Sequence, residues 1–143
     1  MAALSLYLDA SVLDSLFVDD PFAERAERLL RGRLGTSVVS NFAAAEFSSA
    51  VARLVRMNEL TRDEAALAFS DFDRLWGSPR PLIHATRADV SAAQNFIRSL
   101  RFALRTPDAL HLAIAVRLGA ELAAFDQRMA DCARELGLTV AAV

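Results

Sequence analysis

The stretch LSLYLDASVLDSLF at residues 4–17 decides the fold class of this chain. Its first part, LSLYL (4–8), is a short apolar run that predicts a buried β-strand ending at Asp9. Residues 10–17 then predict a short helix. A strand followed at once by a helix is the beginning of a βα unit, and such units build α/β folds with parallel sheets.

The same alternation continues to the end of the chain. Short apolar or β-branched runs that predict further strands occur at 36–40, 82–84, 121–125 and 138–143. Segments that predict helices lie between them, at about 21–33, 41–57, 61–76, 86–101, 106–118 and 127–136. The sequence therefore predicts one three-layer α/β/α domain over residues 1–143, with a mostly parallel sheet of about five strands.

Polar signals mark the starts of several of these helices. Thr61 and Glu64 have the spacing of a capping box, and Thr86 is placed to cap the next helix. Thr106 comes directly before Pro107, which predicts an N-cap followed by proline at the first helical position.

The bulk composition limits the possible classes of protein. Hydrophobic residues make up 54% of the 143, a surplus that favours a partner interface. The longest stretch without Asp, Glu, Arg or Lys runs only from Leu34 to Ala45, shorter than the ~18 residues of a membrane-spanning helix. The start of the chain carries no basic segment and predicts no signal peptide. The single cysteine, Cys132, excludes an internal disulfide. We therefore expect a cytoplasmic protein.

Every one of the 16 basic residues is an arginine, and the net charge is −2. The absence of lysine disfavours P-loop enzymes, Schiff-base chemistry and phosphotransfer sites that need a lysine. The small net charge gives no general basic field for nucleic acid.

Four carboxylates lie where a parallel sheet places its ligand sites, beyond the carboxyl ends of the strands. Asp9 and Asp126 each follow a strand and precede a helix, so each is alternatively an N-cap. Asp108 lies in the first turn of a helix, where the helix dipole also favours an acid. Glu46 lies within an apolar helix with no cation one turn away, and its alternative is a solvated edge position.

Taken together, the four acids favour a metal site. Carboxylates that converge at one edge of a sheet repel one another unless a cation lies among them. Hard oxygen ligands suit Mg²⁺ or Mn²⁺, which also accept phosphate oxygens. Such a metal polarises a phosphodiester and activates a bound water, so the acids predict a nuclease.

The stretches around these acids resemble the PIN-domain family, and most closely its VapC-type toxins from bacterial toxin–antitoxin pairs. The resemblance covers the whole chain, and the matching stretches are YLDASVL (7–13), AAAEFSSA (43–50), TPDALHLAIA (106–115) and LAAFDQRMA (122–130). It implies an endoribonuclease that uses Mg²⁺ or Mn²⁺, on a parallel five-stranded sheet. It further implies a homodimer that is silenced by a VapB-type antitoxin.

The resemblance also assigns the site residues. The family's metal-binding and catalytic acids carry over to Asp9, Glu46, Asp108 and Asp126, and Ser11 matches a hydroxyl that supports the metal site. The sequence departs from the family at Ala124, where a Thr or Ser is common, and this leaves open the role of Asp126.

Two other interpretations are set against a ribonuclease. A PIN-like module without catalysis would only bind RNA or a protein partner. A phosphohydrolase with Asp9 as nucleophile would need a second acid where the chain has Ser11, and a lysine that it lacks. His111 is placed either to orient Asp108 or to fill the core or an interface. Three arginines near Asp108 are either phosphate contacts or a solvated helix face: Arg98, Arg101 and Arg105.

Overall fold

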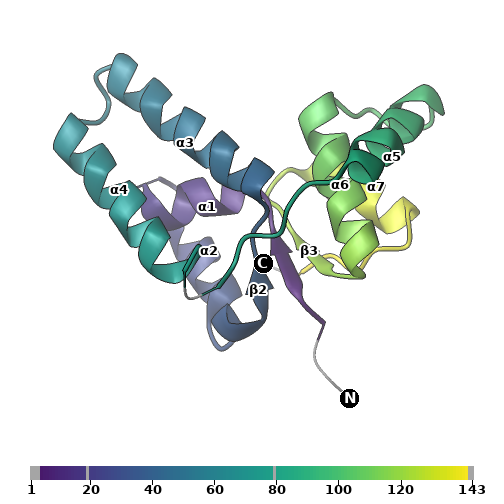
Figure 1. The fold of residues 1–143 in the computed structure, drawn as a ribbon, viewed down its shortest axis with the longest axis horizontal. Coiled ribbons are helices and arrows are strands. Elements are labelled where there is room, and N and C mark those ends of the chain that lie inside the picture. The colour runs from purple at the N-terminus through teal and green to yellow at the C-terminus, as the bar shows by residue number, and fades with distance from the viewer. Residues whose placement is uncertain (1–3, 19, 79, 142–143) are drawn as a thin grey trace.

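A parallel β-sheet forms the centre of the molecule. The computed structural model describes residues 4–18, 20–78 and 80–141. The strands are β1 (Leu6–Leu8), β2 (Ser37–Val38) and β3 (Glu121–Ala123), in the order β2-β1-β3. In Figure 1 they stand edge-on between two groups of helices. The central position of β1 agrees with the apolar run that precedes Asp9, because a central parallel strand is covered on both faces.

Two of the five expected strands, at 82–84 and 138–143, are present only as single bridges. Ser40 pairs with Ile83 beyond β2, and Leu122 pairs with Val140 beyond β3, both in parallel orientation. Residues 142–143 of the expected last strand lie outside the described part of the chain. The five-stranded arrangement is thus reduced to three strands with one bridged segment at each edge. An edge segment has a partner on one side only, so fewer ladder hydrogen bonds hold it in extended form.

The helices lie close to their expected positions. Their bounds are α1 (Ala10–Phe17), α2 (Ala23–Leu30), α3 (Asn41–Arg56), α4 (Arg62–Leu75), α5 (Arg87–Arg98), α6 (Thr106–Leu118) and α7 (Gln127–Glu135), with a 3₁₀ turn η1 at Leu34–Thr36. Capping boxes start α4 at Thr61 and α5 at Thr86, as predicted. The predicted cap of α6 was wrong by one residue, because its N-cap is Arg105. Proline fits throughout a first helical turn, so Pro107 did not fix the boundary.

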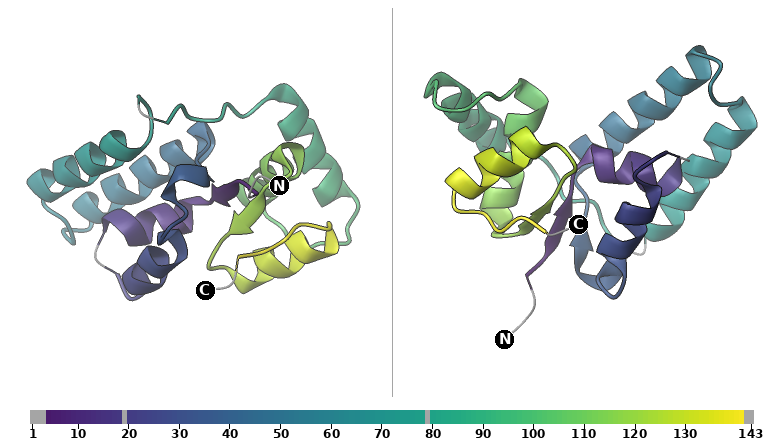
Figure 2. Two further views of the ribbon diagram at one scale, coloured as in Figure 1. Left: turned by 90° about the horizontal axis from the view of Figure 1, so that it is seen from below. Right: turned by 180° about the vertical axis from the view of Figure 1, so that it is seen from behind.

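The helices cover both faces of the sheet, and the three-layer α/β/α fold is confirmed. Leu6 and Leu8 of β1 pack with α1, α2, α3 and α4. Tyr7, between them, points to the other face and packs with α5, α6 and α7. The views in Figure 2 show the same two groups of helices on opposite sides of the strands.

Aromatic packing fixes α3 against its neighbours. The Phe47 ring lies 5.5 Å from the ring of Phe17 in α1 and 5.3 Å from that of Phe72 in α4, measured between centroids. Phe47 is 1% exposed. Aromatic pairs of this kind add to the stabilisation from burial, so the adjacent Glu46 projects from a firmly held turn.

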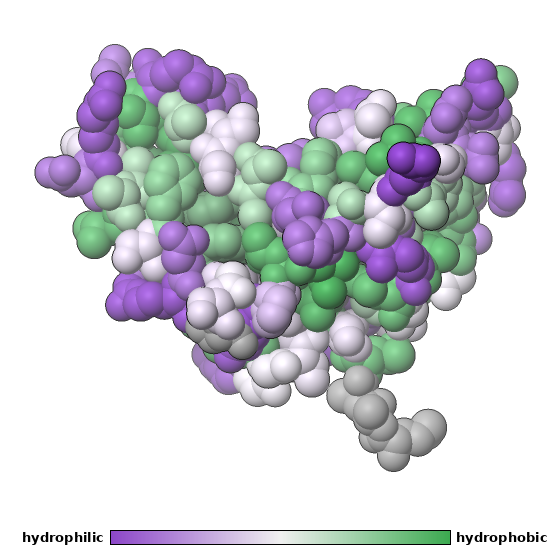
Figure 3. Space-filling view, in the orientation of Figure 1, coloured by the Kyte–Doolittle hydropathy of each residue, from purple (hydrophilic) through white to green (hydrophobic). Residues whose placement is uncertain are grey.

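The surface is mixed in character. Figure 3 shows hydrophobic residues across the middle of one face, between the two groups of helices, with hydrophilic residues concentrated at the projecting helix ends. Within the described residues, no helix combines the length and the apolar character that crossing a membrane requires.

Candidate active site

Asp9 lies immediately after the central strand and caps the helix that follows. Its Oδ1 accepts hydrogen bonds from the Ser11 hydroxyl (2.6 Å) and from the backbone N–H of Val12 (3.2 Å). Both bonds go to the same oxygen, so Oδ2 has no protein donor among the described residues. Asp9 is only 6% exposed. The capping alternative is therefore correct, and it leaves one carboxylate oxygen available to a ligand.

Ser11 joins the ends of two neighbouring strands. Its hydroxyl donates to Asp9 and accepts a 3.4 Å hydrogen bond from the backbone N–H of Phe125, just beyond β3. The hydroxyl that is absent at Ala124 is thus matched by one that reaches the same segment from α1. Ser11 holds Asp9 in one rotamer and fixes its distance from the segment that leads to Asp126.

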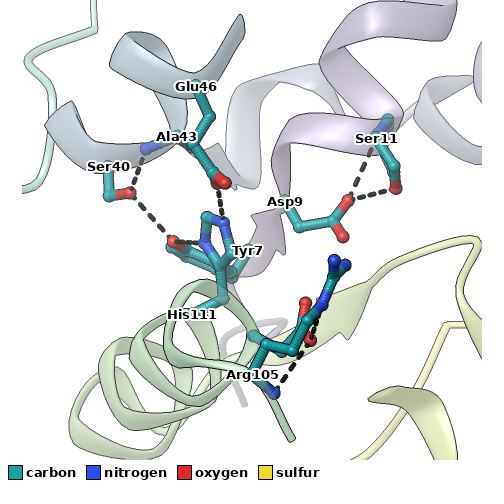
Figure 4. A network of polar contacts seen from close by, with 10 residues as sticks. Tyr7, Asp9, Ser11, Ser40, Ala43, Glu46, Arg105 and His111 are labelled. Carbon is teal, nitrogen blue, oxygen red and sulfur yellow. Dashed lines mark hydrogen bonds and ion pairs between the residues drawn. The ribbon is translucent and has the colours of Figure 1, made fainter. Parts of the chain in front are cut away.

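Glu46 finds its partner on a different element. Its Oε1 is hydrogen-bonded to Nε2 of His111, which comes from α6 on the opposite side of the sheet (Figure 4). The Glu46 side chain is 31% exposed, whereas that of His111 is 4% exposed. The expectation that His111 orients Asp108 is not met among the described contacts, because the ring is directed to Glu46.

Asp108 and Asp126 line a shared open pocket of about 760 Å³. Asp126 caps α7 and accepts from the backbone N–H of Arg128 at 2.8 Å. Asp108 accepts from the backbone N–H of Arg105 at 3.4 Å, and the Arg105 Nε lies 3.7 Å from the same carboxylate. Arg105 therefore brings positive charge to the acidic pocket, whose lining also includes Arg128.

The acids repel one another where they approach. Burial raises the pKa of Asp9 and the Glu46 carboxylate adds to this, whereas the hydrogen bonds from Ser11 and Val12 and the nearby His111 act in the opposite direction. Burial, together with the charges on Asp9, Asp20 and Glu46, also raises the pKa of Asp14 in α1 to about 7. Burial and neighbouring carboxylates thus disfavour the ionised forms of both Asp9 and Asp14.

The oxygen donors suit a hard divalent cation in their chemistry, and Asp9 offers a free oxygen beside other acids. As the side chains stand, no three Asp, Glu, His or Cys groups of the described residues surround one point closely enough to bind a metal ion. The structure brings the acids together as two neighbouring pairs. One is Asp9 with Glu46, which interact electrostatically, and the other is Asp108 with Asp126, which share the pocket.

Two polar features were not expected from the sequence. The Tyr7 hydroxyl is bonded to both His111 Nδ1 (2.7 Å) and Ser40 Oγ (2.8 Å). Asp14 is partly buried, and its Oδ1 has no hydrogen-bond partner among the described residues. A tyrosine in the middle of an apolar strand is a usable signal, because a buried phenol needs a partner. The spacing of five residues between Asp9 and Asp14, within one short helical segment, could also have been noticed.

The fold and the site together define a class of protein. A three-layer α/β/α structure carries acids beyond the carboxyl ends of its parallel strands, where such folds bind ligands. The sequence matches the PIN-domain family over residues 6–135. The chain therefore belongs to the PIN-domain family.

Individual relatives agree with this assignment. The chain is 36% identical to Ribonuclease VapC46 of Mycobacterium tuberculosis strain H37Rv, over 96% of this chain and 97% of the relative. It is 31% identical to Ribonuclease VapC45 of strain CDC 1551, over 95% and 94%.

Solved structures share the fold at lower sequence identity. M. tuberculosis VapC20, described as a sarcin–ricin loop cleaving toxin, has a TM-score of 0.71 at 21% identity, covering 90% of this chain and 95% of its own. FitAcB of Neisseria gonorrhoeae has a TM-score of 0.72 at 16% identity, covering 96% of both.

Proposed function

We propose that this chain is a divalent-metal-dependent endoribonuclease and acts as the toxin of a type II toxin–antitoxin pair. One observation carries the proposal: a chain 36% identical to a ribonuclease over 96% of its length has acids just beyond two of its parallel strands, β1 and β3, and two further acids on the helices α3 and α6. Those acids are Asp9, Glu46, Asp108 and Asp126. The reaction is hydrolysis of an RNA phosphodiester bond.

In this proposal Asp9, Asp108 and Asp126 would hold Mg²⁺ or Mn²⁺, and the Asp9 oxygen that the protein leaves unbonded would be available to it. When bound, the metal polarises the phosphodiester and makes a bound water more acidic. Ser11 keeps Asp9 in place through its 2.6 Å hydrogen bond. Glu46 is more exposed than Asp9 and is placed to hold metal or to orient the attacking water.

The RNA backbone approaches through the arginines. Arg105 and Arg128 line the same pocket as Asp108 and Asp126. Guanidinium groups bind phosphate oxygens well, so these two side chains position the strand beside the acids. The Arg105 contact with Asp108 is a 3.7 Å ion pair on an exposed side chain, and such pairs exchange readily for a phosphate.

The partners follow from the relatives. FitAB of N. gonorrhoeae and VapBC2 of Rickettsia felis are structural neighbours, each solved bound to DNA. We extend this to the present chain as a single PIN domain that binds a VapB-type antitoxin, forms a homodimer and works in the cytoplasm. Hydrophobic residues on the surface, including Val90 and Val116, provide area for such contacts.

The test is cleavage of total RNA by the purified chain, freed of any co-purifying protein. We expect cleavage in Mg²⁺ or Mn²⁺ that EDTA abolishes. The Asp9→Asn variant should lose cleavage and growth toxicity while its circular dichroism spectrum stays that of the wild type, because one neutral oxygen replaces a charged ligand. The control is Asp73→Asn, at an exposed position of α4.

Two results would contradict this assignment. Wild-type cleavage rates in Asp9→Asn would remove Asp9 from the site. RNA binding by the wild-type chain without cleavage in either metal would favour the alternative, a catalytically inactive PIN-like module that binds RNA or a protein.

A further inference from the structure

His111 is a buried histidine whose two ring nitrogens are both hydrogen-bonded. Nε2 is bonded to Oε1 of Glu46, and Nδ1 lies 2.7 Å from the Tyr7 hydroxyl. The rings of Phe42 and Tyr7 lie against the imidazole, at 5.1 Å and 5.8 Å between centroids. The ring therefore has little freedom to rotate or to exchange its partners for water.

The hydrogen bonds continue from Tyr7 to the start of α3. The Tyr7 hydroxyl lies 2.8 Å from Oγ of Ser40, and Ser40 Oγ accepts a 2.9 Å hydrogen bond from the backbone N–H of Ala43. Ser40 is the N-cap of α3, the helix that also carries Glu46. The chain of contacts thus begins and ends on α3, passing through β1 and α6 (Figure 4).

The chemistry of the groups gives each hydrogen bond a direction. An ionised carboxylate only accepts, so the His111 nitrogen that faces Glu46 must carry the hydrogen. If the ring carries no second hydrogen, the other nitrogen accepts and the Tyr7 hydroxyl donates to it. Burial raises the pKa of the Tyr7 phenol well above its ordinary value, which keeps that proton in place. The Tyr7 oxygen then accepts from the Ser40 hydroxyl, which accepts in turn from Ala43.

Every donor and acceptor in this series has one partner, and the series ends on a carboxylate that reaches solvent. A histidine that only filled the core would not need to end on a partly exposed acid. Without His111, the flexible Glu46 side chain would be free to rotate away, because no other donor to Glu46 occurs among the described hydrogen bonds.

We propose that His111 is a positioning residue: its Nε2–H holds the Glu46 carboxylate in place, and the Tyr7 and Ser40 hydroxyls fix the ring that does so. The inference rests on the proposed ribonuclease activity for its functional consequence. It adds His111, Tyr7 and Ser40 to the site as residues that support Glu46 without touching RNA or metal themselves.

The experiment compares three variants with the wild-type chain: His111→Ala, His111→Gln and His84→Ala. The alanine variant removes the donor. The glutamine variant keeps a long side chain at position 111 of α6 and restores an N–H group that can be directed at Glu46. His84 is the chain's other histidine and is exposed, so His84→Ala is the matched control.

Two quantities are measured on each variant that retains the wild-type circular dichroism spectrum. They are the turnover rate on an RNA substrate and the affinity for Mn²⁺ without RNA, by titration calorimetry. Loss of a group that orients a ligating carboxylate typically costs roughly 10–100-fold, so we expect that loss in His111→Ala. Most of it should return in His111→Gln, and His84→Ala should match the wild type. A folded His111→Ala with wild-type turnover and Mn²⁺ affinity would overturn the inference, as would a glutamine variant no better than alanine.

A measurement on the wild-type chain covers the case in which the variants fail to fold. Nitrogen-15 NMR of the imidazole should show a hydrogen on Nε2 of His111. A hydrogen on Nδ1 alone would overturn the inference. If the wild-type chain cleaves no RNA in either metal, the proposed function fails, while the NMR result and the Mn²⁺ affinities still decide the role of His111.

Discussion

Replacing Asp14 with asparagine should stabilise the protein at alkaline pH. Asp14 lies on α1 with one carboxylate oxygen that has no partner among the described residues. Burial, together with the nearby charges of Asp9, Asp20 and Glu46, raises its pKa from 3.8 to about 7. At a pH between these two values, the native protein therefore holds a proton on Asp14 that the unfolded chain has already released.

The sign of the effect follows from that difference. Between about pH 4 and pH 7 the native state binds more protons than the unfolded state, so the free energy of unfolding falls as the pH rises. The change from 3.8 to about 7 corresponds to about 4 kcal/mol. Because part of the side chain contacts solvent, which screens the charge, we expect about 2 kcal/mol in practice. Asparagine removes the charge and with it this cost.

The assay is urea denaturation of wild-type and Asp14→Asn proteins at pH 5 and pH 8, in EDTA so that no metal binds the acids. We expect the variant to be more stable by about 2 kcal/mol at pH 8, with a smaller advantage at pH 5. The exposed Asp73→Asn serves as the control and should stay within about 0.5 kcal/mol of the wild type at both pH values. An advantage of equal size at both pH values, or a less stable variant at pH 8, would refute the assigned cause.

Two further changes test other parts of the fold. Arg117 donates two hydrogen bonds, of 2.8 and 3.0 Å, to the buried Asp89, so Arg117→Met should lower the free energy of unfolding by about 2–3 kcal/mol in urea at pH 7. An unchanged denaturation midpoint would show that the pair contributes nothing. Leu100 follows α5 with φ +58° and is 89% exposed, so Leu100→Gly should relieve left-handed backbone strain and raise stability by about 0.5–1 kcal/mol. Thermal denaturation would measure this, and a lower melting temperature would contradict it.

The helices could be predicted more closely than the strands, for a physical reason. Capping is local: Thr61 and Thr86 each start a helix through hydrogen bonds to residues three positions away. Strand length depends on partners distant in sequence. The apolar run at 82–84 contains a residue that pairs through a single bridge, because this segment lies at the edge of the sheet. A strand signal in the sequence carries no information about how many neighbours the strand will have.

The candidate acids were identified from the sequence, but their partners were not. The position of Asp9 after an apolar strand was enough to place it at the carboxyl end of the sheet. Glu46 was correctly noted as lacking a cation one turn away on its own helix. Its partner, His111, is distant in sequence and reaches it from across the sheet, so no spacing rule connects the two. The repulsion that raises the pKa of Asp14 is likewise a product of folding.

The distribution of charge around β1 connects the stability of the fold with the proposed metal site. Asp9 is nearly buried, and Asp14 and Glu46 lie close enough for their charges to be felt. Hydrogen bonds from Ser11 and His111 satisfy single oxygens on Asp9 and Glu46 but do not neutralise the total charge. Arg105 is paired with Asp108 in the neighbouring pocket. Uncompensated buried charge is costly, so the divalent cation proposed for this site would, when bound, remove the repulsion and stabilise the fold.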